Sequence, residues 1–108
     1  MILVDKDIEN YEKNNELIIS GYKKENLNGI SYDLTLDVVY DVDSQEHGVY
    51  EIQPGETVFV KTVEELKIPN RILGRVAEKN SRMRQGLKVD APHYQPGHQT
   101  YAFLRVQN

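Results

Sequence analysis

The 108-residue sequence contains no cysteine and no tryptophan. Without cysteine, disulfide bonds and thiolate catalysis are excluded, and the commonest ligands of structural zinc are missing. No apolar run is long enough to span a membrane, and the N-terminus becomes charged at Asp5, too early for the apolar stretch of a signal peptide. We therefore expect a cytoplasmic protein without a membrane partner.

Positive charge is also scarce. The chain has 13 Lys and Arg against 17 Asp and Glu, which gives a formal net charge of -4. Proteins that bind long nucleic acids concentrate positive charge, so we do not expect nucleic acid as a partner. The length allows one hydrophobic core, and we expect a single domain over residues 1–108. Self-association would cover apolar strands that so small a domain cannot cover alone.

The hydrophobic pattern predicts a mainly β fold with one short N-terminal helix over residues 5–14, where Ile8 and Tyr11 lie three apart. Strict alternation over residues 32–42 predicts a half-buried strand with Tyr32, Leu34 and Leu36 on one face. Short strands between Pro and Gly turns favour a barrel or sandwich over an alternating α/β fold. Further strands are expected at 17–20, 49–52, 57–62, 72–76, 87–89 and 101–106, with a helical turn at 63–66.

The densest group of functional side chains lies in the stretch 79–84, which contains Lys79, Asn80, Ser81, Arg82 and Arg84. Cationic groups neutralise a polyphosphate, while hydroxyl, amide and backbone N–H groups fix its oxygens. A solvated turn has the same composition, so composition alone leaves both interpretations open.

Four stretches carry a resemblance to a known family. MILVDKDI at 1–8 and ISYDLTLD at 30–37 resemble the N-terminal helix and first long strand of dCTP deaminases, and PGETVFVKTVEELKIPNRILGR at 54–75 resembles the segment that follows. EKNSRMRQGL at 78–87 is similar to the superfamily motif that reads Arg-Ser-Ser and continues to an Arg and a Gly-Leu. The chain thus resembles the dUTPase and dCTP deaminase superfamily.

This resemblance implies a dUTPase-like β-clip, a distorted barrel, and a homotrimer with active sites between subunits. The partner would be a deoxyribonucleoside triphosphate, dCTP or dUTP, with Mg²⁺ carried by the triphosphate and not by a cage of protein ligands. The strand pair and mobile tail that end the family pattern have no match here. We therefore expect either a domain incomplete at its C-terminus or a shortened relative.

The matched motifs also assign candidate site residues. Ser81 and Arg84 keep the phosphate motif, Lys79 replaces its first Arg and Asn80 its first Ser. The resemblance therefore implies phosphate binding by these side chains, and binding of the base and sugar by Tyr94, Gln95, Phe103 and Leu104. For Tyr94 the alternative, a core tyrosine with its hydroxyl satisfied, is the commoner outcome.

Two positions depart from the family chemistry. Gln95 stands where dUTPases have the aspartate that activates water, and Arg105 stands where dCTP deaminases have a proton-shuttling glutamate. Neither side chain is a general base near neutral pH. Asp90 and Glu78 are the nearby acids that could replace them, unless both are merely exposed to solvent. His93 and His98 do not share a helix face, and no metal site is expected from them.

Two main hypotheses follow. The first is a dCTP deaminase-like enzyme that converts dCTP to dUTP, with or without hydrolysis of dUTP to dUMP and pyrophosphate. The second is a non-catalytic member that binds a nucleotide or a partner protein on the same scaffold, which the residues Gln95 and Arg105 favour. An unrelated β-domain is a third possibility, disfavoured by the number and order of the matched motifs.

Overall fold

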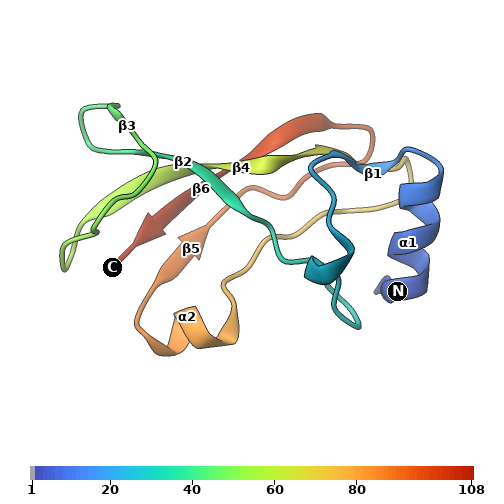
Figure 1. Cartoon of the computed structure of the whole chain (residues 1–108), viewed down its shortest axis with the longest axis horizontal. Coiled ribbons are helices and arrows are strands. Elements are labelled where there is room, and N and C mark those ends of the chain that lie inside the picture. Colours follow the sequence, from blue (N-terminus) through green and yellow to red (C-terminus); the bar gives the residue numbers. More distant parts are fainter. Residues whose placement is uncertain (1) are drawn as a thin grey trace.

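The computed structural model describes residues 2–108, which form one open antiparallel sheet of six strands with a short helix at one end (Figure 1). Five strands follow the order β3-β2-β4-β6-β5, and β1 pairs separately with β4. No helix among these residues has the length and apolar character needed to cross a membrane. In chain order the elements are α1 (Asp5–Lys13), β1 (Leu17–Ser20), the 3-10 turn η1 (Lys24–Asn26), β2 (Leu36–Tyr40), β3 (Glu46–His47), β4 (Thr57–Lys67), α2 (Asn80–Arg84), β5 (Lys88–Asp90) and β6 (Gln99–Gln107).

Strand β4 is the centre of the sheet. It pairs with β6 along one edge, and along the other edge it pairs first with β2 and then with β1. Alternate residues of β4 face the core, which buries them almost completely: Val58, Val60, Thr62, Glu64 and Leu66. The period of two is what a strand with one buried face requires.

The pairing of β4 with β6 is interrupted by a bulge. Lys61 pairs with Phe103 and Glu65 pairs with Tyr101, so three residues of β4 lie opposite Ala102 alone. The Thr62 hydroxyl accepts the Ala102 N–H at 3.0 Å and donates to the Glu64 carbonyl at 3.0 Å. One buried side chain thus replaces the ladder hydrogen bond that the bulge removes.

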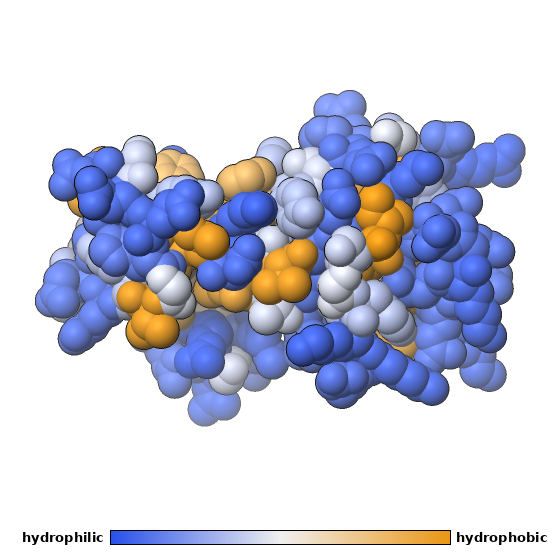
Figure 2. Space-filling view, turned by 45° about the horizontal axis from the view of Figure 1, so that its top comes forward, coloured by the Kyte–Doolittle hydropathy of each residue, from blue (hydrophilic) through white to orange (hydrophobic). Residues whose placement is uncertain are grey.

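The core lies on one face of this sheet and unites Ile18, Ile68 and Tyr94 with inward residues of β4 and β6. The opposite face carries the half-exposed rings of Phe59 and Phe103, 52% and 50% exposed respectively. Over the face drawn in Figure 2, apolar residues are interrupted by hydrophilic ones and form no continuous patch.

Several sequence-based predictions are confirmed. The mainly β class and the N-terminal helix are correct, and Asp7 accepts the Val4 N–H at 3.1 Å at the start of α1. The strand at 17–20 is β1. The strand at 101–106 lies within β6, with Ala102, Leu104 and Val106 facing inward as their alternation predicted.

Other predictions were wrong for identifiable reasons. Residues 63–66 form no helical turn, because β4 continues through its bulge and pairs onward with β1 and β6. The predicted strand at 49–52 is irregular, with Val49 94% exposed, and the stretch 72–76 contributes only an isolated bridge between Gly74 and Tyr94. The polar connection before β5 contains the helix α2, which sequence analysis missed.

The predicted strand at 32–42 is shortened to β2. A register shift between Leu36 and Val38 reverses the faces of the strand, so Leu34 and Val39 pack against the core whereas Leu36 is 54% exposed. A strictly alternating sequence cannot reveal such a shift, because the residues on either side keep the same pattern.

We predict that Thr62→Val destabilises the protein by about 1–3 kcal/mol, because it leaves the buried Ala102 N–H unsatisfied while keeping the side-chain volume. Urea denaturation measures the loss. Thr35→Val is the matched control, since that hydroxyl accepts only a long, exposed bond of 3.4 Å from Asn26, and we expect a change within about 0.5 kcal/mol. Equal losses in the two variants would contradict the role given to Thr62.

Candidate functional site

A hollow of about 830 Å³ lies against the core face of the sheet. Its floor is apolar and consists of side chains from β1, β4, β6 and the loop before β6: Ile18, Leu66, Tyr94, Leu104 and Val106. Two chain segments, at 30–36 and 74–82, supply most of the rest of its lining, and the remainder comes from Leu17, Ile68, Leu87 and Val89. Small-molecule sites typically enclose about 300–1,000 Å³ and are largely apolar, so this hollow has the size and character of one.

The first wall, at 30–36, is held by the polar turn that precedes it. The backbone of Asn28 bonds that of Ser31 at 2.8 Å, and the Asp33 N–H donates to the Asn26 carbonyl at 2.9 Å. The Asn28 amide also donates to Asp33 Oδ1 at 2.9 Å. Asn and Asp side chains stabilise turns in this way, which fixes the Asp33 carboxylate at the edge of the hollow.

The second wall, at 74–82, is fixed at two points. Gly74 and Tyr94 exchange backbone hydrogen bonds of 2.8 and 2.9 Å, and a Cβ on Gly74 would lie only 3.1 Å from the Tyr94 Cβ. Farther along, the Glu78 carboxylate accepts the Val89 N–H at 2.7 Å. That hydrogen bond is the main reason why the pKa of Glu78 lies below its ordinary value.

The structure brings together only part of the proposed phosphate motif. Lys79 and Asn80 line the hollow, and Arg82 joins them. Ser81 and Arg84 are exposed on α2 and are not among the described residues that line the hollow. Lys79 Nζ lies 3.1 Å from Asp33 Oδ2, so the two walls meet in an ion pair at the rim.

The proposed base and sugar residues are likewise divided. Tyr94 and Leu104 line the floor, whereas the side chains of Gln95 and Phe103 are exposed. Tyr94 is 3% exposed, its hydroxyl donates a long bond of 3.5 Å to the Phe103 carbonyl, and burial raises its pKa. The expectation of a core tyrosine is therefore confirmed, and the same ring forms part of the hollow's surface.

Both candidate replacement acids are engaged in other contacts. Asp90 Oδ2 lies 3.0 Å from Arg105 Nη2, and Glu78 is held by the Val89 N–H. A lowered pKa makes Glu78 a weaker base than an ordinary glutamate. One oxygen of each carboxylate is thus already engaged, Oδ2 of Asp90 by Arg105 and Oε2 of Glu78 by the Val89 N–H.

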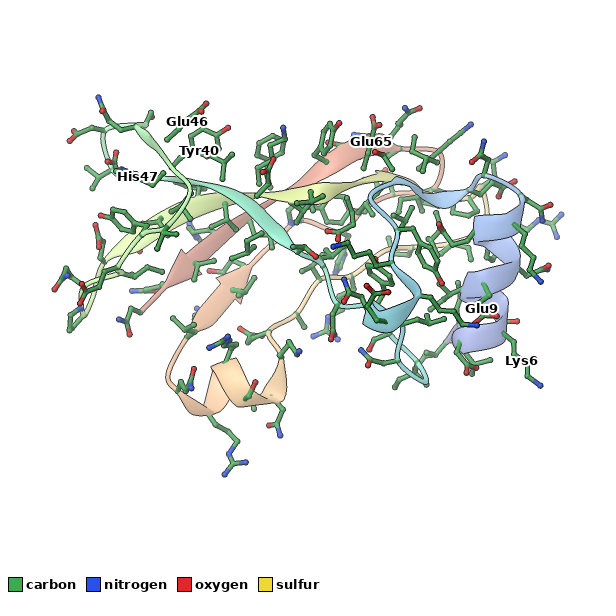
Figure 3. The ribbon with its side chains drawn as sticks, in the orientation of Figure 1. Lys6, Glu9, Tyr40, Glu46, His47 and Glu65 are labelled. Atoms are coloured by element: carbon green, nitrogen blue, oxygen red, sulfur yellow. The ribbon has the colours of Figure 1, made fainter. Side chains whose placement is uncertain are left out.

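The histidines lie elsewhere. His93 and His98 are exposed. His47, on β3 beside Tyr40 and Glu46 (Figure 3), lies 2.8 Å from Asp41 and lines no part of the hollow among the described residues. Residues 2–108 contain no group of three or more His, Cys, Asp or Glu side chains placed to hold a metal ion.

No pattern in the sequence predicts Asp33 as a site residue. It lies in the stretch ISYDLTLD that carries part of the resemblance, but the alternation of that stretch gives it only a place on the polar face of a strand. Its contact with Lys79 joins residues 46 positions apart, since 79 minus 33 is 46. No local pattern predicts such a contact.

No model of a known protein family matches the chain, and no curated protein matches it.

We predict that Glu78→Gln removes a contribution to the free energy of unfolding that is present near neutral pH and absent in acid. Because the folded protein holds the pKa of Glu78 below its ordinary value of 4.5, the carboxylate contributes stability above that pH, and the contribution disappears as pH falls through the lower folded pKa. The stability gap between the wild type and Glu78→Gln should therefore be largest near neutral pH and close in acid. Urea midpoints at a series of pH values measure this gap.

Glu51→Gln is the matched control, because Glu51 is exposed and makes no side-chain hydrogen bond within residues 2–108. The difference in urea midpoint between Glu51→Gln and the wild type should not change with pH. A gap for Glu78→Gln that is equally flat would show that the Val89 contact does not hold the ionised carboxylate.

Proposed function

We propose that the chain is a dCTP deaminase-like protein of pyrimidine deoxynucleotide metabolism, with the dUTPase-like β-clip fold, and that it binds dCTP or dUTP in the hollow. The observation that carries this proposal is the single hollow in which an apolar floor at Tyr94 and Leu104 shares its lining with Lys79 and Asn80. A nucleotide needs an apolar surface for its base and sugar and cations for its phosphates.

In this proposal the pyrimidine lies on the floor beside Tyr94, and the phosphates reach the rim at Lys79. The triphosphate would carry its own Mg²⁺, which neutralises part of its charge. Ser81 and Arg84 lie exposed on α2 and do not face this hollow. They fit the homotrimer that the resemblance implies, because there an exposed residue of one subunit can complete the site of its neighbour.

Binding is the part of this function that the geometry supports most directly. Deamination of dCTP requires a group that moves protons to and from the ring, and hydrolysis of dUTP requires a base that activates water. Gln95 and Arg105 can do neither, and Asp90 already has one of its carboxylate oxygens engaged by Arg105. The Asp90–Arg105 ion pair therefore favours a second candidate function, a member of the superfamily that binds the nucleotide without turnover.

We predict that Lys79→Ala weakens the binding of dCTP or dUTP with Mg²⁺ by about tenfold, because a charge-assisted contact to phosphate is lost. Isothermal titration calorimetry measures the affinity. Lys67→Ala is the matched control, since Lys67 is an exposed lysine on β4 outside the hollow, and it should bind like the wild type. Failure of the wild type to bind either nucleotide would refute the proposal.

The products of the same mixtures decide between the two candidate functions. Incubation of the protein with dCTP or dUTP and Mg²⁺, followed by chromatography, resolves substrate from product. Formation of dUTP from dCTP, or of dUMP and pyrophosphate from dUTP, would identify an enzyme and exclude the binding-only function. Binding in the calorimeter without any product would establish the non-catalytic member.

A further inference from the structure

The most unusual buried group in the protein is the carboxylate of Glu64, whose residue is 0% exposed. Its Oε1 accepts the backbone N–H of Thr35 at 2.7 Å, while Oε2 is buried without a hydrogen-bond partner within residues 2–108. An incompletely satisfied carboxyl group in a core is costly, and an apolar side chain there would avoid that cost. The stabilising interaction that Glu64 makes in this position is its hydrogen bond with the Thr35 N–H.

Glu64 lies within the bulge of β4 and beside Thr35. There the Thr35 carbonyl accepts the Val63 N–H at 2.9 Å, so both backbone groups of Thr35 are bonded to the bulged residues. The β2–β4 ladder itself runs from Leu36 onward. Thr35 is therefore the point at which the wall at 30–36 leaves the sheet, and Glu64 holds that point from inside the core.

From Thr35 the wall leads directly to the rim of the hollow. Leu34 packs against the core, and Asp33 is the partner of Lys79 at 3.1 Å. Lys79, which is the one lysine that lines the hollow within residues 2–108, is thus held by a carboxylate two residues from the point that Glu64 fixes. A shift of the wall at Thr35 moves Asp33, and with it the side chain of Lys79.

We propose that Glu64 is a positioning residue for the anion-binding rim of the hollow: by holding the Thr35 N–H it fixes the wall that presents Asp33 to Lys79. Its effect on nucleotide affinity rests on the function proposed above, whereas its effect on the wall does not. Glu64 itself touches no ligand, because it is not among the described residues that line the hollow.

Two substitutions test separately whether the length of this side chain or its carboxyl group is required. Glu64→Gln keeps an oxygen acceptor at the same distance along the chain, and Glu64→Asp keeps the carboxyl group but shortens the side chain by one methylene. Glu65→Asp is the matched control for shortening. Glu65 is half-exposed and accepts a bond of 3.3 Å from Gln99, on the face of the sheet opposite α2 (Figure 3).

The first readout is amide hydrogen exchange in the protein without nucleotide, measured by NMR. We expect Glu64→Asp to speed exchange at Thr35 by about tenfold or more, with the Val60 and Ala102 amides in the centre of the sheet unchanged. Glu64→Gln and Glu65→Asp should stay within about threefold of the wild type at Thr35. Unchanged exchange at Thr35 in Glu64→Asp would overturn the proposal.

The second readout is the affinity for dCTP with Mg²⁺. We expect Glu64→Asp to weaken binding by about fivefold or more. Glu64→Gln, made in the wild-type protein, should keep the wild-type affinity. Rapid exchange at Thr35 combined with wild-type affinity would show that the wall does not position Lys79, which also overturns the proposal. If the wild type binds no nucleotide, the proposed function fails, and the exchange at Thr35 still decides whether Glu64 holds the wall.

Loss of protection across the whole sheet in Glu64→Asp would show that this variant is unfolded. Glu64→Gln then decides the matter, because it keeps the reach to Thr35. A folded Glu64→Gln protein with a protected Thr35 amide supports the proposal. A folded one with an exposed Thr35 amide, beside normal protection at Val60, overturns it.

Discussion

The whole structure depends on the pairing of β4 with β6, which joins the two longest strands of the sheet. Three other strands attach to this pair directly, β1 and β2 to the outer edge of β4 and β5 to the end of β6, and β3 is joined to it through β2. Inward residues of these two strands are the most deeply buried in the core, each at most 1% exposed: Val58, Val60, Thr62, Glu64 and Ala102. A chain of this length can build one such core and no second.

The bulge in this pair turns a stable sheet into a candidate binding site. Three residues of β4 lie opposite Ala102, where the Thr62 hydroxyl accepts the Ala102 N–H and the inward carboxyl group of Glu64 accepts the Thr35 N–H. The segment at 30–36 then stands away from the sheet as a wall, and the space behind it is the hollow. Bulges are common beside functional sites for this reason, since they redirect a side chain without ending the strand.

The sequence predicts those parts of the fold that are encoded locally. The helix α1 and the inward face of β6 follow from short-range periodicity, which the structure confirms. The faces of β2 and the continuation of β4 beyond Thr62 do not follow, because each depends on a register shift against a partner strand. Residues 63–66 look helical in isolation, and only their pairing with β1 and β6 makes them a strand.

The site was predictable to the same degree. The stretch 79–84 is rich in phosphate-binding groups by composition, and the structure puts Lys79 and Asn80 at the hollow while leaving Ser81 and Arg84 outside it. Long-range partners were beyond prediction: nothing near Lys79 in the sequence indicates Asp33, and nothing near Glu64 indicates Thr35. The partners of the Asp90 and Glu78 carboxylates were also beyond prediction, because the residue type does not indicate whether an acidic side chain is paired or free.

The most direct test of this account is an NMR titration of the protein with dCTP and Mg²⁺. The account predicts that the largest shifts occur at the amides of Lys79, Asp33, Tyr94 and Leu104, which surround one hollow although they come from distant parts of the sequence. Shifts confined to the opposite face of the sheet, around Phe59 and Phe103, or no shifts at saturating nucleotide, would contradict it.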